Sequence, residues 1–221
     1  KILCEKPMTV NYNEAKEAFK FIKDNKTSFL EAFVFRHHKQ SQNLSDIIKK
    51  GEIGDIYEVE SSFGYKVKKT NPNSRIFNKD LGGGSILDVG CYTTSFCLMI
   101  AKIIFEQKVL NIKVENIKGN IGVTGVDESA EASLIFDTNI KMSIKTSLRE
   151  ELKNNCTIYG SRGKIIIPSP WVPNKKSVLE IYTGNTYYKQ FLNSKLSAYA
   201  QQIDFFNKRN FNDKKNLVDT F

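Results

Sequence analysis

The clearest alternation of hydrophobic and polar positions runs from residue 140 to residue 147. Apolar and polar side chains follow one another there in strict order: Ile140, Lys141, Met142, Ser143, Ile144, Lys145. Because successive side chains of a β-strand point to opposite faces of its sheet, this pattern predicts a strand with one covered face. Extended patterns predict further strands at 56–63, 108–114, 130–136, 155–159, 164–167, 178–182 and 186–191. Short connections at 137–139, 160–163 and 184–185 predict hairpins, so we expect a largely antiparallel sheet.

Three other stretches have the apolar spacing of amphipathic helices. Their apolar positions are Ala15, Ala18, Phe19 and Ile22 in the first, Leu44, Ile47 and Ile48 in the second, and Leu196, Tyr199, Ile203 and Phe206 in the third. Gly51 is expected to end the second helix. Apolar runs at 2–4 and 27–34 predict buried strands on either side of the first helix, and Pro7 cannot continue the first strand. Lys6 therefore stands at a strand end, where doubly wound sheets place ligands.

A glycine-rich stretch, 82–84, precedes an apolar run with helical spacing, so it predicts a loop that leads into a helix. Asp88 and Tyr92 are one turn apart on that helix and share a face. A carboxylate and a phenol at such a place can move protons to and from a hydroxyl or carbonyl group. A structural explanation is also open, because an aspartate suits the first turn of a helix and a tyrosine packs well at its rim.

Composition narrows the class of protein. With 221 residues, of which 40% are hydrophobic, the chain can bury the core of one large domain or two small ones. The sequence contains no apolar run of about 20 residues and no signal peptide, although its start at Lys1 leaves a targeting signal open. The cysteines, at positions 4, 91, 97 and 156, have neither metal-site nor disulfide spacing. We therefore expect a cytoplasmic protein without a metal site or membrane contact.

The net charge of +9 is compatible with nucleic-acid binding, but the lysines are spread along every segment. Because there is no arginine-rich run or basic patch interleaved with aromatic residues, we expect no nucleic-acid partner. The charge is better explained as solvated surface, or more weakly as a pocket that favours anionic substrates.

Five segments, in order, resemble the glucose–fructose oxidoreductase / inositol dehydrogenase / rhizopine-catabolism (Gfo/Idh/MocA) family. Glu5-Lys6-Pro7 is similar to the family's E-K-P, and residues 31–38 to its E-x-x-x-R-x-H-P segment. Residues 51–55 resemble its G-x-I-G turn, 82–92 its G-G-G-x-x-x-D-x-G-x-H/Y motif, and 158–165 its I-x-G-x-x-G-x-I hairpin. Lys39 stands where the family has a proline, and Tyr92 takes the place of the histidine, as in one branch of the family.

The resemblance implies an oxidoreductase that transfers a hydride between NAD or NADP and a sugar, polyol or related diol. It implies that Tyr92 is the acid/base, and that the positive charge of Lys6 favours the ionised phenol and contacts the nicotinamide ribose. Asp88 would orient Lys6 or accept a bond from a substrate hydroxyl. Arg75 and His38 are further candidates for substrate binding. Glu5, Lys6 and Pro7 would border the cofactor, with a cis Lys6–Pro7 peptide.

The dinucleotide fingerprint G-x-G-x-x-G is missing from the sequence, although family members carry it before E-K-P. The chain therefore resembles an enzyme that lacks most of its Rossmann half. We expect an α+β fold: a remnant of a parallel Rossmann unit in residues 1–35, then a substrate-binding and oligomerisation domain in 36–221. That domain would be an open sheet with helices on one face and a homo-oligomer contact on the other. The alternative is a non-catalytic binding or oligomerisation domain of the same fold.

Overall fold

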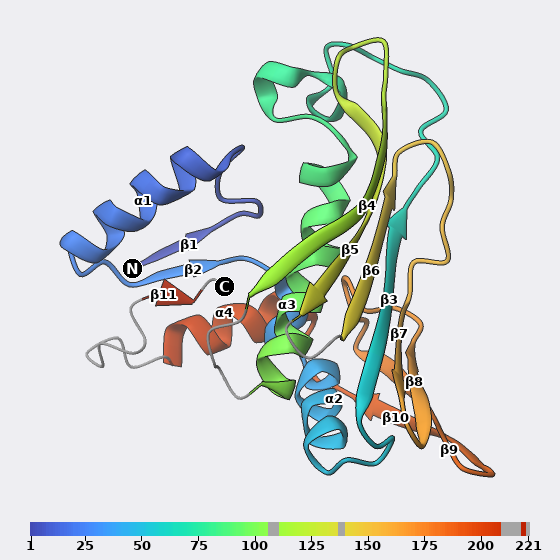
Figure 1. The fold of residues 1–221 in the computed structure, drawn as a ribbon. Coiled ribbons are helices and arrows are strands. Elements are labelled where there is room, and N and C mark those ends of the chain that lie inside the picture. Colours follow the sequence, from blue (N-terminus) through green and yellow to red (C-terminus); the bar gives the residue numbers. More distant parts are fainter. Residues whose placement is uncertain (106–110, 137–139, 209–217, 220–221) are drawn as a thin grey trace.

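The computed structural model describes residues 1–105, 111–136, 140–208 and 218–219, which form two sheets (Figure 1). The small sheet is parallel and has the order β1-β2-β11, with β1 at Ile2–Cys4, β2 at Phe29–Glu31 and β11 at Val218–Asp219. Helix α1 (Tyr12–Asp24) connects β1 to β2. Its first turn is capped by Asn11, whose side-chain oxygen accepts a hydrogen bond from the Glu14 backbone N–H.

The large sheet has eight strands in the order β10-β9-β8-β7-β3-β6-β5-β4. Their bounds are β3 Ile56–Gly64, β4 Ile112–Ile121, β5 Asp127–Phe136, β6 Lys141–Ser147, β7 Cys156–Gly160, β8 Gly163–Ile167, β9 Lys176–Thr183 and β10 Thr186–Asn193. Neighbouring strands are antiparallel except for the central pair β3 and β6, which is parallel. The predicted α+β fold, with a parallel unit followed by a largely antiparallel open sheet, is confirmed.

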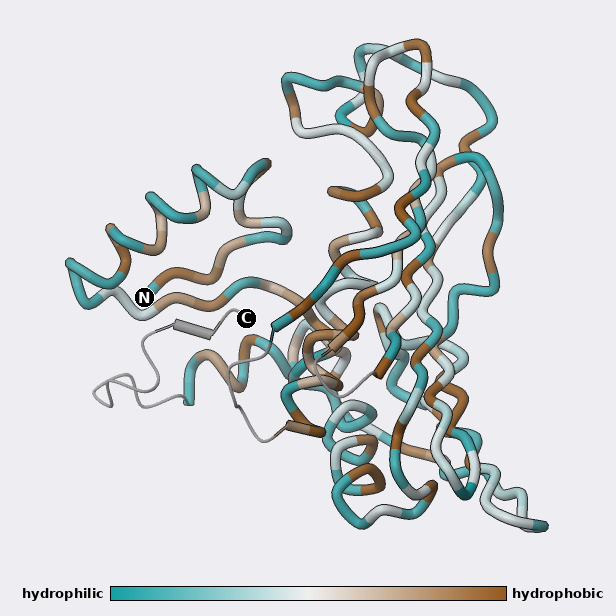
Figure 2. Tube along the Cα trace, viewed as in Figure 1, coloured by the Kyte–Doolittle hydropathy of each residue, from teal (hydrophilic) through white to brown (hydrophobic). Residues whose placement is uncertain are grey.

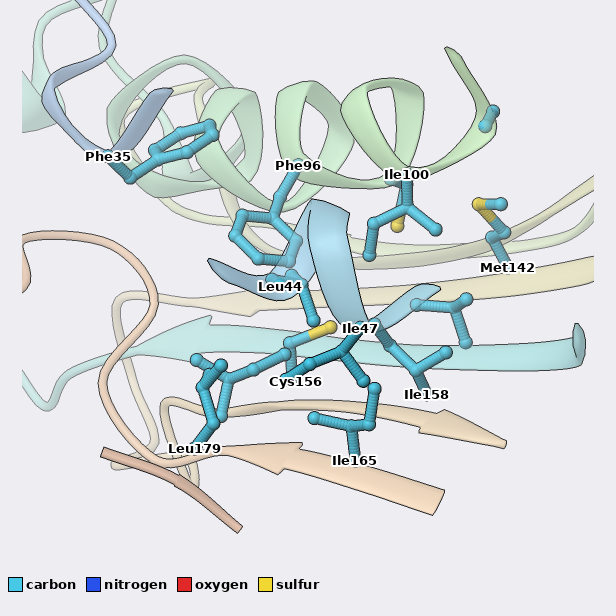
Figure 3. Packing of buried hydrophobic residues seen from close by; sticks show 14 of the residues in the cluster. Phe35, Leu44, Ile47, Phe96, Ile100, Met142, Cys156, Ile158, Ile165 and Leu179 are labelled. Carbon is cyan, nitrogen blue, oxygen red and sulfur yellow. The ribbon is translucent and has the colours of Figure 1, made fainter. Parts of the chain in front are cut away.

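The main core lies between the large sheet and helices α2 (Lys39–Lys49) and α3 (Cys91–Ile104), which pack on one of its faces (Figure 1). Phe96 and Ile100 of α3 face Leu44 of α2 and the strand residue Ile158, and all four side chains are almost completely buried (Figure 3). Hydrophobic and polar residues alternate along several strands (Figure 2). The face away from the helices therefore carries polar and charged residues, among them Glu60, Lys141 and Lys145. Helix α4 (Ala198–Lys208) packs against the 3-10 turn Val34–His37.

Within the part of the chain that the structure describes, one helical stretch, Lys79–Ile104, is long and apolar enough to cross a membrane by length and composition. More than half of its most apolar window, 56%, is buried within the protein. This burial is typical of the central helix of a soluble domain, where the apolar side chains pack against a sheet.

The structure differs from the sequence prediction in several elements. The first strand was predicted to be buried, but Ile2 and Leu3 of β1 are exposed. The strand predicted at 27–34 is limited to Phe29–Glu31, because the chain turns into the 3-10 helix Val34–His37 and buries Phe35 in the main core. The strand predicted at 108–114 appears as the longer β4, while 108–110 and the 137–139 connection lie outside the described residues. Strand β11 was not predicted. The boundary near residue 35 stays a prediction.

Candidate active site

The glycine-rich stretch leads into a π-helix, Ile86–Gly90, which continues directly as α3. Asp127 of β5 fixes its start: one carboxylate oxygen accepts bonds from the Ser85 hydroxyl at 2.6 Å and the Ile86 N–H at 2.8 Å. Gly84, with φ at +115°, has no room for a side chain, because a Cβ would lie 2.2 Å from the other oxygen of Asp127. The turn expected to be α-helical is instead a wider π turn, a form that is frequent at functional sites.

Lys6 reaches this π turn from the small sheet. Its ammonium donates a hydrogen bond to the backbone carbonyl of Asp88 at 2.7 Å and lies 4.6 Å from the centre of the Tyr92 ring. The turn that carries Lys6 is held by Glu31, whose Oε1 accepts the Met8 N–H at 2.9 Å, and its Lys6–Pro7 peptide is cis. Burial raises the pKa of the Glu31 carboxyl. The structure thus brings together Lys6, Asp88 and Tyr92.

Asp88 is buried, and both of its carboxylate oxygens have partners. The Tyr65 hydroxyl donates to Oδ2 at 2.5 Å, and the guanidinium of Arg75 forms an ion pair with Oδ1. The Arg75 side chain remains 56% exposed, so it borders solvent as well as the carboxylate. The Asp88 side chain therefore orients the phenol of Tyr65 and the guanidinium of Arg75. The Asp88 backbone carbonyl orients the ammonium of Lys6.

Tyr92 is buried among aromatic rings. The rings of Phe33 and Phe63 both meet it edge-on, at 5.6 Å between centroids. Burial raises the pKa of the Tyr92 phenol, and the neighbouring Tyr199 adds to the effect. The expectation that a nearby cation favours the ionised phenol is not met in this chain, because Lys6 lies on the ring face and donates to a carbonyl.

His38 has a different environment. Its ring is fully buried, and its Nδ1 accepts the backbone N–H of Gln40 at 3.1 Å, so it caps the first turn of α2. This contact gives His38 a role in helix capping, and the geometry provides no support for the expected substrate contact. Glu5 and Pro7 flank Lys6 at the end of β1 and place its side chain at the site.

Tyr65 was not predicted as a site residue, although the sequence carries a signal for it. Val59, Ser61 and Phe63 lie on the covered face of β3, where Phe63 packs against Tyr92. Continuing this period of two past Gly64 would have placed Tyr65 on the same face, beside the helix that carries Asp88.

Comparison with known proteins gives the family of the chain. Residues 41–166 match the GFO/IDH/MocA C-terminal domain. The chain belongs to the GFO/IDH/MocA family.

Curated relatives in the family include dehydrogenases of diols and sugars. Trans-1,2-dihydrobenzene-1,2-diol dehydrogenase of Xenopus tropicalis is 30% identical over 173 residues, which are 78% of this chain and 50% of the relative. D-xylose 1-dehydrogenase (NADP(+)) 2 of Haloferax volcanii is 34% identical over 94 residues, which are 42% of this chain and 28% of the relative. The chain spans about half the length of the diol dehydrogenases that it matches.

Solved structures share the fold of the chain. KijD10, a 3-ketoreductase from Actinomadura kijaniata in complex with NADP and TDP-benzene, has a TM-score of 0.77 at 22% identity, covering 92% of this chain and 61% of KijD10. Aldose-aldose oxidoreductase from Caulobacter crescentus also has a TM-score of 0.77, at 16% identity, covering 93% of this chain and 60% of that enzyme.

Proposed function

We propose that the chain provides the substrate-binding and proton-transfer part of an NAD- or NADP-dependent oxidoreductase. The substrate is a sugar, polyol or related diol whose CH–OH group is oxidised, or the corresponding carbonyl compound. The observation that carries the proposal is the ammonium of Lys6, bonded to the Asp88 carbonyl and 4.6 Å from the centre of the Tyr92 ring. Family membership and the diol and xylose dehydrogenases among the relatives support it.

The residues present fit one end of a nicotinamide cofactor. The turn Glu5-Lys6-Pro7 follows β1, a parallel strand, and the carboxyl end of such strands is where doubly wound sheets bind dinucleotides. Because the sequence holds no G-x-G-x-x-G, these residues would hold the nicotinamide end rather than the adenosine end. The cofactor, when bound, accepts or donates the hydride.

The protein groups then have to move the hydroxyl proton. Tyr92 serves as the acid in carbonyl reduction, because burial raises the pKa of its phenol and keeps it protonated at neutral pH. In alcohol oxidation the phenol must give up its proton first, and its raised pKa makes this the harder direction at neutral pH. Asp88 and the half-exposed Arg75 bind substrate hydroxyls beside Tyr92.

Replacement of Tyr92 by Phe tests the proposal in the complete gene product. Sugars and polyols are first screened with both cofactors to find a substrate. We expect Tyr92→Phe to lower turnover by about two to four orders of magnitude, because the proton donor is lost, while cofactor affinity stays nearly unchanged. Tyr12→Phe, at a tyrosine that is 76% exposed, is the matched control and keeps full turnover.

Near-normal turnover of Tyr92→Phe would remove the acid/base role. A complete gene product that transfers no hydride from either cofactor would favour the second candidate, a non-catalytic binding or oligomerisation domain. The missing fingerprint is the observation that favours this second candidate.

The proposal extends to assembly and location. The uncovered face of the large sheet forms a homo-oligomer contact, since it is broad and carries both signs of charge around a shallow depression of about 480 Å³. Its polar character is compatible with an interface, because many interfaces are no more apolar than the rest of the surface. The cytoplasm is the proposed location, because Cys4, Cys91, Cys97 and Cys156 are all free thiols.

A further inference from the structure

The segment between β3 and the π-helix carries both side chains that hold the Asp88 carboxylate. Tyr65 stands at its start, and Arg75 begins the 3-10 turn Arg75–Phe77 ten residues later. Between them the chain follows an irregular course. Some other contact must fix this loop, residues 65–84, for both side chains to meet one carboxylate.

Arg149, which follows β6, makes that contact. Its Nε donates to Glu128 Oε2 at 2.7 Å, and a terminal nitrogen bonds to Glu128 Oε1 and to the Thr70 hydroxyl, the latter at 2.5 Å. The same guanidinium lies 5.1 Å from the centre of the Phe77 ring, within cation–π range. One side chain thus joins strand β5, the middle of the loop and the 3-10 turn that carries Arg75.

A small apolar cluster, separate from the main core, supports this contact. Phe77, Val126 and Leu148 are buried there, and Tyr65, Val67 and Ile76 pack against them. The backbone N–H groups of Tyr65 and Val67 donate to the carbonyls of Ser147 and Leu148, at 3.0 and 2.9 Å. The loop is therefore attached to the segment that carries Arg149 by apolar, backbone and charged contacts.

The Glu128 carboxylate is closely surrounded by other groups of the protein. Its side chain is only 9% exposed, so the charge depends on Arg149 for compensation. Gly122 leaves room for it: a Cβ at that position would lie 2.1 Å from Glu128 Oε1. The buried Glu128 carboxylate therefore determines the position of the Arg149 guanidinium. The same guanidinium can still bind the loop through Thr70 and Phe77.

We propose that Arg149, oriented by Glu128, is a positioning residue that fixes loop 65–84 and thereby places Arg75 and Tyr65 on Asp88. Its effect on substrate affinity rests on the proposed function, whereas its effect on the loop does not. Arg149 touches neither Asp88 nor Tyr92 in the structure, so it acts through Thr70 and Phe77.

Proteolysis tests the loop contact without any need for activity. The loop contains Lys66, Lys68 and Lys69, whose exposed side chains are trypsin sites. In the complete gene product we expect Arg149→Met to accelerate cleavage there by about tenfold or more, because cleavage follows local opening. Lys145→Met is the matched control: it removes the exposed ion pair between Lys145 of β6 and Glu150, the residue after Arg149, and leaves cleavage unchanged.

Thr70→Val keeps the test decisive if Arg149→Met does not fold, because it leaves the buried pair of Arg149 and Glu128 intact. It removes only the hydroxyl that joins Arg149 to the loop, and we expect about a threefold acceleration. Cleavage of Thr70→Val and of a folded Arg149→Met at the wild-type rate would overturn the proposal.

Kinetics test the consequence at the site once a substrate is known. We expect Arg149→Met to raise the KM for the substrate by about tenfold or more with cofactor affinity unchanged, because Arg75 and Tyr65 are no longer held in place. Arg149→Lys restores only part of the effect, since one ammonium cannot pair with Glu128, bind Thr70 and cover Phe77 together.

The two proposals fail in different ways. If the wild-type protein transfers no hydride, the proposed function fails while the cleavage rates still decide the loop contact. If the wild type is active and the loop of Arg149→Met opens without a change in KM, the positioning role of Arg149 is wrong.

Discussion

At the scale of residues, the candidate active site is organised around one residue, Asp88. Asp88 is held by the Tyr65 hydroxyl and the Arg75 guanidinium, and its backbone carbonyl accepts from Lys6. Such a group is well ordered because each partner limits the movement of the others. A substrate hydroxyl that binds Asp88 has to compete with Arg75, whose side chain is the more exposed of its two side-chain partners.

The Tyr65 contact leads to a prediction about stability. Tyr65→Phe should lower the free energy of unfolding by about 1–2 kcal/mol, because a hydrogen bond to a charged carboxylate is lost while the ring still packs. Urea unfolding followed by fluorescence measures the change, and Tyr12→Phe serves as the exposed control. An unchanged unfolding midpoint in Tyr65→Phe would show that this hydrogen bond contributes no net stability.

His38 leads to a prediction about pH. Burial lowers its pKa below the ordinary value of 6.5, and Nδ1 must be unprotonated to accept the Gln40 N–H. Because the folded-state pKa is the lower one, His38 contributes stability above pH 6.5 that is lost as the pH falls through the folded-state value.

His38→Asn keeps a side-chain acceptor at the helix start but cannot titrate. We therefore expect its unfolding free energy to fall less than that of the wild type between about pH 7.5 and pH 5. Urea titrations at both pH values measure the difference, and parallel behaviour of the two proteins would contradict the assignment.

The sequence was sufficient for part of the site and not for the rest, for identifiable reasons. Lys6, Asp88 and Tyr92 could be named because a strand end, a helical spacing and a family resemblance each point to them. The protonation state of Tyr92 could not be predicted, because the pKa of its phenol depends on burial by rings from distant segments. The capping role of His38 is a local contact between residues two apart, but it could not be predicted because histidine is not among the residues usually preferred at a helix N-cap.

At the scale of elements, strands were easier to predict than their ends. The alternation identifies β6 because each pair of neighbours from Ile140 to Lys145 has opposite polarity. The π-helix Ile86–Gly90 has no comparable signal, since its side chains would suit an α-helix equally well. It forms where Asp127 of a distant strand binds Ser85 and Ile86, a contact that local sequence cannot show.

The hairpin of β7 and β8 provides a prediction at this scale. A Cβ on Gly163 would lie 1.9 Å from the Tyr182 carbonyl oxygen, so Gly163→Ala must push β8 away from β9. We expect a loss of about 2–3 kcal/mol in unfolding free energy. Gly184→Ala is the control: its φ of +54° costs about 1 kcal/mol, but nothing lies within 4 Å of the new atom. Equal losses in a thermal or urea unfolding experiment would argue against the contact.

At the scale of the whole molecule, the two sheets differ in how far they could be predicted. The large sheet follows from hairpins between successive strands, which are local in sequence. The parallel contact of β3 with β6 and the return of β11 to β2 join segments far apart, and no local pattern specifies such partners. The predicted layers were therefore right, while the order of the strands had to come from the structure.

The uncovered face of the large sheet leads to the last prediction, which concerns assembly. Ser133 and Ser143 lie opposite each other at the middle of this face, within the depression of about 480 Å³. If two copies meet there, Ser143→Arg places a long charged side chain in the contact and should convert a dimer of the complete gene product into a monomer. Gln42→Arg, on an exposed position of α2, adds the same charge on the helix side and should leave the dimer intact.

Sedimentation velocity at several protein concentrations measures the oligomeric state of both variants. A dimer that survives Ser143→Arg would place the contact elsewhere, and a monomeric wild type would remove the proposed assembly altogether.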